Sequence, residues 1–79
     1  MRFEIDRIDE EMLQLFEERM GIVKLVKSYK KEHQLNVLDT TREQQVLEKN
    51  LLKLKDKTLE KVYIKFLQHL MDLSKELQQ

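Results

Sequence analysis

Apolar side chains recur every three or four residues over the first third of the chain, which is the period of one face of an α-helix. One row consists of Ile5, Ile8, Met12, Leu15, Ile22, Val26 and Tyr29, and a neighbouring row of Leu13, Phe16, Met20 and Val23. Gly21 lies within the pattern, but a single glycine weakens a helix without ending it. The pattern predicts one continuous helix from about residue 3 to about residue 33, roughly 45 Å long, that is covered on two sides.

Two shorter helices are expected in the second half of the chain. Thr40 and Glu43 have the spacing of a capping box, which marks the start of a helix that ends near Lys53. Asp56 and Thr58 offer cap chemistry for a last helix. Apolar residues then follow at heptad spacing almost to the end of the chain: Leu59, Val62, Phe66, Leu70, Leu73 and Leu77. No repeat or linker divides residues 1–79, so we expect one domain.

Composition supports an all-α fold. The 79 residues contain no Pro and a single Gly, and 38% of them are charged. A compact globule of this length is only about 30 Å across, which is shorter than the first helix. One end of that helix must therefore be covered by another chain, and we expect a homodimer.

Charge and residue usage argue against several classes of protein. Lys and Arg number 15 and Asp and Glu number 15, so the electrostatic attraction that brings proteins to nucleic acid is missing. There is no cysteine, and His33 and His69 are isolated, so no metal site or other cofactor is expected and both histidines should face solvent. No stretch approaches the roughly 20 apolar residues of a membrane span, and we expect a cytoplasmic protein.

Polar residues stand at places where the periodic pattern predicts apolar ones. Arg19 and Lys30 are 11 residues apart, so they share a helix face about 16 Å apart along the axis and can close on one small anion. Ser74 and Gln78 point in one direction from the last helix. Arg2 is about 25 Å from Arg19 along the first helix, so it can join such a site only from a second subunit. These residues predict a polar pocket inside a helical bundle.

On the basis of these residues, the chain resembles the all-helical chorismate mutases, in which three-helix chains form an intertwined dimer. The resemblance covers nearly all 79 residues. It rests on Arg2, Ile8-Asp9, Glu18-Arg19, Lys30, the stretch Asp39-Thr40-Thr41-Arg42-Glu43, and Ser74 with Gln78.

The resemblance implies conversion of chorismate to prephenate, a Claisen rearrangement in the biosynthesis of Phe and Tyr. Arg19 and the partner's Arg2 would hold the two substrate carboxylates, with a hydrogen bond from Ser74. By the same resemblance, Lys30 and Gln78 would donate to the ether oxygen. Asp39 and Glu43 would meet the ring hydroxyl, and Arg42 would line the pocket beside them.

Each of these residues also has a structural interpretation. Arg19 can neutralise a carboxylate at a dimer seam, and Lys30 can favour the C-terminal dipole of its helix. The capping box accounts for Glu43, and loop or cap chemistry for Asp39. Two other functions therefore stay open: an isochorismate pyruvate lyase on the same fold, and a non-catalytic helical dimerisation module.

Overall fold

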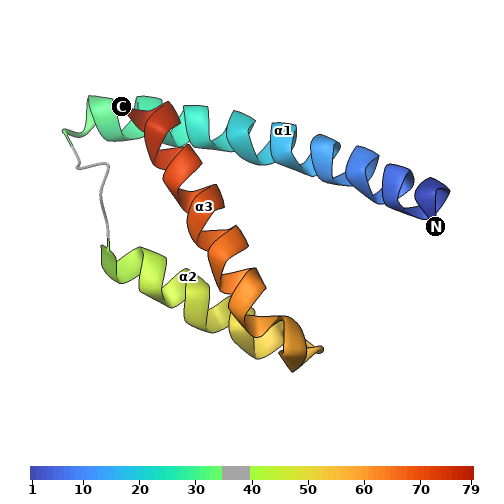
Figure 1. Cartoon of the computed structure of the whole chain (residues 1–79). Coiled ribbons are helices and arrows are strands. Elements are labelled where there is room, and N and C mark those ends of the chain that lie inside the picture. Colours follow the sequence, from blue (N-terminus) through green and yellow to red (C-terminus); the bar gives the residue numbers. More distant parts are fainter. Residues whose placement is uncertain (35–39) are drawn as a thin grey trace.

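The computed structural model describes residues 1–34 and 40–79, and nearly all of them are helical (Figure 1). The elements are α1 (Arg2–Glu32), α2 (Thr40–Lys53), a short 3-10 helix η1 (Lys57–Leu59) and α3 (Glu60–Gln78). The described residues contain no strand. The prediction of an all-α chain with one long and two shorter helices is confirmed. None of these helices combines the length and apolar character needed to cross a bilayer.

The long first helix is continuous through Gly21, as the apolar period predicts. A Cβ atom built on Gly21 would meet no atom within 4 Å, so no close approach requires glycine there. The helix ends at Glu32, and the C-cap residue His33 donates its backbone N–H to the Tyr29 carbonyl at 3.1 Å. Gln34 then takes a φ of 57°, the left-handed conformation that commonly follows a helix end.

Side-chain caps form the turn between α2 and α3. The Asp56 carboxylate accepts a hydrogen bond from the Thr58 backbone N–H at 3.0 Å and so caps η1. The cap expected for the last helix therefore lies one short helix earlier, because the N-cap of α3 is Leu59, which makes no side-chain cap bond. Lys57 Nζ donates to the Leu51 carbonyl at 2.6 Å and so satisfies one of the last acceptors of α2.

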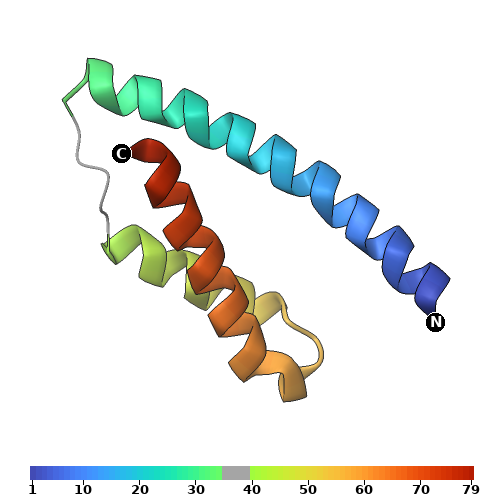
Figure 2. The same ribbon diagram turned by 45° about the horizontal axis from the view of Figure 1, so that its top comes forward.

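The C-terminal part of α3 packs on the second half of α1 (Figures 1 and 2). The apolar side chains buried at this contact are Met20, Val23, Leu67 and Met71. The buried row of α3 also includes Ser74, so it differs from the row at heptad spacing expected from the sequence. Phe66 and Val62 of that expected row are 53% and 59% exposed. The reason is that α1 meets the adjacent face of α3.

The N-terminal half of α1 extends beyond the other helices and is bare (Figure 2). Residues 1–18 are all exposed, including Ile5 at 57%. A groove of about 430 Å³ lies where this half meets α3. It is lined mainly by apolar side chains: Asp9, Met12, Leu13, Leu15, Phe16, Arg19, Phe66 and Leu70. The chain thus leaves much of its apolar surface uncovered.

Candidate active site

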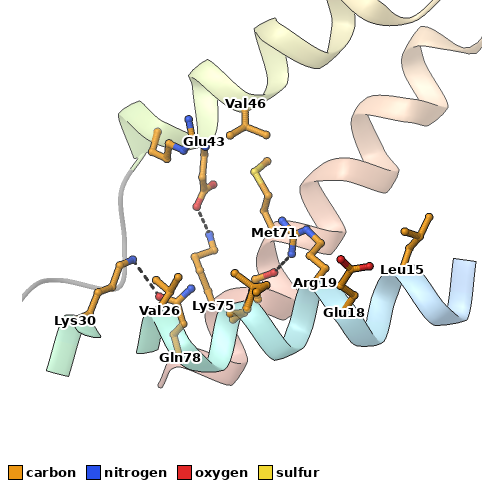
Figure 3. Close-up of a pocket in the computed structure, with 14 residues that line it drawn as sticks. Leu15, Glu18, Arg19, Val26, Lys30, Glu43, Val46, Met71, Lys75 and Gln78 are labelled. Atoms are coloured by element: carbon orange, nitrogen blue, oxygen red, sulfur yellow. Dashed lines mark hydrogen bonds and ion pairs between the residues drawn. The ribbon is translucent and has the colours of Figure 1, made fainter. Parts of the chain in front are cut away.

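All three α-helices contribute to a pocket of about 680 Å³ (Figure 3). Its apolar lining consists of Leu15, Ile22, Val23, Val26, Val46 and Met71. Its polar lining consists of Glu18, Arg19, Lys30, Arg42, Glu43, Ser74, Lys75 and Gln78. The floor is the packed contact of α1 with α3, and α2 forms the opposite wall (Figure 3).

Arg19 and Ser74 form the first polar pair in this pocket. The Arg19 guanidinium donates to the Ser74 hydroxyl. Ser74 is 6% exposed, and its hydroxyl also donates to the Leu70 carbonyl at 2.9 Å. Within the described residues Arg19 has no carboxylate at ion-pair distance, so its charge is not neutralised by a neighbour on its own helix. Arg19 is half-buried beside the pocket and is held there by a neutral partner.

Lys30 and Gln78 form the second pair. Lys30 Nζ donates to Gln78 Oε1 at 3.0 Å. Because an ammonium group can only donate, this contact fixes which end of the amide faces Lys30 and leaves the amide N–H donors for another acceptor. Nearby, Lys27 Nζ donates to the Gln79 carbonyl at 3.1 Å. Two lysines of α1 therefore hold the last turn of α3, where a helix end would otherwise fray.

The third pair, Glu43 and Lys75, belongs to a polar ring that joins α2 to α3. Lys75 Nζ lies 3.0 Å from Glu43 Oε2 and 3.2 Å from Asp72 Oδ1. Gln68 Nε2 closes the ring, donating to Glu43 Oε1 at 3.3 Å and to Asp72 Oδ1 at 3.1 Å. Glu43 therefore bonds to α3, and α2 begins at Thr40, where the sequence predicts a helix start.

The polar ring changes the proton affinity of two of its members. Hydrogen bonding to Glu43, and then to Asp72, raises the pKa of Lys75 above its ordinary value of 10.5. Hydrogen bonding from Gln68, and then from Lys75, lowers the pKa of Asp72 below its ordinary value of 3.8. Lys75 is therefore charged at neutral pH, with its side chain 25% exposed beside the pocket.

The pocket has a positive electrostatic balance. Among the described residues, four cationic side chains line it, against the two carboxylates of Glu18 and Glu43, which is an excess of two positive charges. The cations are Arg19, Lys30, Arg42 and Lys75. The chain as a whole has a net charge of +0, so this excess is local. An anion with two charges matches the pocket.

The structure brings six of the eight residues predicted for the site into this one pocket: Arg19, Lys30, Arg42, Glu43, Ser74 and Gln78. Arg2 does not line it, because it lies at the far end of α1 (Figure 1). Asp39 lies outside the described residues. His33 and His69 are exposed, as predicted.

Two charged lining residues, Lys75 and Glu18, have no site role predicted from the sequence. Lys75 precedes Gln78 by three residues, so helix spacing places both on the same side of α3. This spacing could have identified Lys75 from the sequence. Its partner Glu43 is on another helix, and no local pattern links the two. Glu18 adjoins Arg19 in the chain and lines the pocket beside it (Figure 3).

Comparison with known proteins agrees with this geometry. The family model described as chorismate mutase type II matches residues 1–79. The chain belongs to the chorismate mutase type II family. No curated protein and no solved structure gives a significant match to the chain. The resemblance noted in the sequence is thereby confirmed, and membership of this all-helical family supports chorismate mutase activity, an isomerase reaction.

Proposed function

We propose that this chain catalyses the Claisen rearrangement of chorismate to prephenate, a step in the biosynthesis of Phe and Tyr. One observation carries the proposal: a single pocket of a family member gathers Arg19, Lys30, Ser74 and Gln78, and its described lining residues have two positive charges in excess. Chorismate is a dicarboxylate, so its charge complements the pocket. The cytoplasmic location expected from the sequence stays a prediction.

The reaction requires the protein only to position the substrate and to stabilise charge. A pericyclic rearrangement needs no nucleophile, metal or general base, so a protein accelerates it by holding the reactive conformer and stabilising charge that develops on the ether oxygen. In the proposed complex Arg19 binds one carboxylate with help from Ser74. Lys30 and the amide N–H of Gln78 donate to the ether oxygen. Val26 and Met71 are apolar surfaces against which the ring packs.

The other end of the substrate meets α2 in this proposal. Glu43 accepts a hydrogen bond from the ring hydroxyl, and Arg42 lines the pocket beside it. Asp39 is proposed to act at the same end on the strength of the family resemblance alone. Glu43 is well placed for this role because its carboxylate lies across the pocket from α1 and is bonded to α3 at both oxygens (Figure 3).

The second carboxylate is assigned to Arg2 of a second copy. In its own chain Arg2 is about 25 Å from Arg19 along the helix axis. We propose an intertwined homodimer in which the bare half of α1 lies in the apolar groove beside Phe16 and Phe66 of its partner. This arrangement would bury the exposed stripe that begins at Ile5 and complete each pocket in the same step.

Side-by-side assays on chorismate and isochorismate test the assignment. If the chain is a chorismate mutase, it should convert chorismate to prephenate with saturable kinetics and release little pyruvate from isochorismate. Pyruvate release as the main activity would instead make the chain an isochorismate pyruvate lyase. A folded dimer that acts on neither, and whose melting temperature a dicarboxylate transition-state mimic does not raise, would be a non-catalytic dimerisation module.

A further inference from the structure

Among the described cations of the pocket, Lys75 is the one that neither the sequence pattern nor the proposed mechanism includes. It lies on α3 between Ser74 and Gln78, the residues that pair with Arg19 and Lys30. In Figure 3 its side chain extends across the pocket toward Glu43 on α2. A lysine that interacted only with water would extend into solvent, so the orientation of the Lys75 side chain across the pocket requires an explanation.

The ion pair of Lys75 with Glu43 is more sheltered from solvent than the ion pair within the exposed part of α1. The side chains of Lys75 and Glu43 are 25% and 19% exposed. The pair of Arg7 with Glu11 on α1 is 62% and 61% exposed. Exposed pairs contribute little because water screens them and both side chains lose entropy, whereas a sheltered pair holds its geometry more firmly. The Glu43 carboxylate therefore has a fixed direction.

That direction is set from α3 at both oxygens. Lys75 binds Oε2 at 3.0 Å and Gln68 binds Oε1 at 3.3 Å, while Asp72 holds Lys75 in turn. An ionised carboxylate has about four acceptor positions, so these two bonds leave capacity for a ligand hydroxyl. A group whose direction is fixed before binding loses less entropy when the ligand arrives.

We propose that Lys75 is a positioning residue: it holds the Glu43 carboxylate toward the place where the ring hydroxyl of the substrate lies. The inference rests on the proposed function, because that function puts the hydroxyl at Glu43. Lys75 acts through Glu43 and touches no reacting atom. Gln68 and Asp72 support it by completing the ring.

Two synthetic mimics of the transition state test this role. Both are bicyclic ether dicarboxylates, and only one carries the ring hydroxyl. The quantity measured by calorimetry is the ratio of their affinities, which isolates the contribution of the hydroxyl. In Lys75→Met this ratio should fall about tenfold, since a directed hydrogen bond to a charged group is lost. Lys75→Arg should retain most of it, and the exposed α3 variant Lys61→Met should leave it unchanged.

A double-mutant comparison distinguishes the positioning role of Lys75 from a general effect of the substitution on the fold. In a Glu43→Gln background, Lys75→Met should change the ratio no further, because the group through which it acts is gone. A ratio that stays at the wild-type value in Lys75→Met overturns the inference, whatever happens to the melting temperature. A wild-type dimer that binds neither mimic and leaves chorismate intact refutes the proposed function as well, so the two failures are distinguishable.

Discussion

The guanidinium of Arg19 on α1 donates a hydrogen bond to the hydroxyl of Ser74 on α3, two residues that are 55 positions apart in the chain. Ser74 is the buried polar side chain at the contact between these helices, and its hydroxyl also bonds within its own helix to Leu70. One small residue thus joins the packed core to the charged pocket. The orientation of Arg19 depends on it.

Replacing Ser74 by Ala should therefore affect both stability and binding. Ser74→Ala removes the acceptor of Arg19, and we expect a loss of about 1 kcal/mol in the free energy of unfolding, with weaker binding of chorismate. Urea unfolding and KM are the measurements. Ser28→Ala is the matched control, because the Ser28 hydroxyl also bonds to a carbonyl four residues back but lies exposed on α1. Equal effects of the two variants would contradict the role assigned to Ser74.

Sharing of the pocket between subunits predicts complementation. Arg19→Ala and Arg2→Ala should each lower kcat/KM by about a hundredfold or more while the far-ultraviolet circular dichroism stays helical. After subunits are exchanged between the two variants, each heterodimer has one pocket with both arginines. Random exchange should therefore restore roughly a quarter of the wild-type activity. Failure to gain activity, with exchange shown independently by mass, would rule out a pocket that uses Arg2 of a partner.

Gly21 offers a test of the surface of α1. The space around it accepts a Cβ atom, so Gly21→Ala should raise the free energy of unfolding by about 0.5 to 1 kcal/mol through helix propensity. Urea midpoints at one fixed protein concentration measure this change. A decrease in stability would mean that another chain packs closely against this position.

The polar ring predicts a pH dependence of stability at both extremes. The pKa of Asp72 is lowered in the folded chain, chiefly by Gln68, so its contribution is present above 3.8 and is lost as the pH falls through the folded value. The pKa of Lys75 is raised, chiefly by Glu43, so its contribution is present below 10.5 and is lost as the pH rises through the folded value. When the urea midpoint of unfolding is plotted against pH, Asp72→Asn should show a smaller decrease at acid pH than the wild type does. An equal decrease in the variant and the wild type would refute the contribution of Asp72.

Much of the fold could be predicted from the sequence because its signals are local. The helical period continues through Gly21 without a proline, and Asp56 with Thr58 marks the turn before α3. The pocket residue Arg19 was predictable because it replaces an apolar residue in a regular row, and Lys30 because it follows 11 residues, about three turns, later. Their spacing along one helix then places them on one face.

Other features could not be predicted, because they depend on how separate helices meet. Glu43 fits a capping box in sequence, yet its carboxylate bonds to Lys75 and Gln68 once α2 lies beside α3. The buried row of α3 contains Leu67, where the heptad pattern favours Phe66, because packing on α1 selects the face. Local periodicity identifies apolar faces, but it does not say which neighbour covers each of them.

The most direct test of the central claim is the rate at which purified protein converts chorismate to prephenate, followed by ultraviolet absorbance with the product identified. The wild-type chain and the exposed-site control Lys31→Met should show saturable turnover about a millionfold or more above the spontaneous reaction. Lys30→Met should lose most of that rate and stay folded, because the donor to the ether oxygen is gone. A folded wild-type dimer that consumes chorismate no faster than buffer, or equal rates for Lys30→Met and Lys31→Met, would contradict the account.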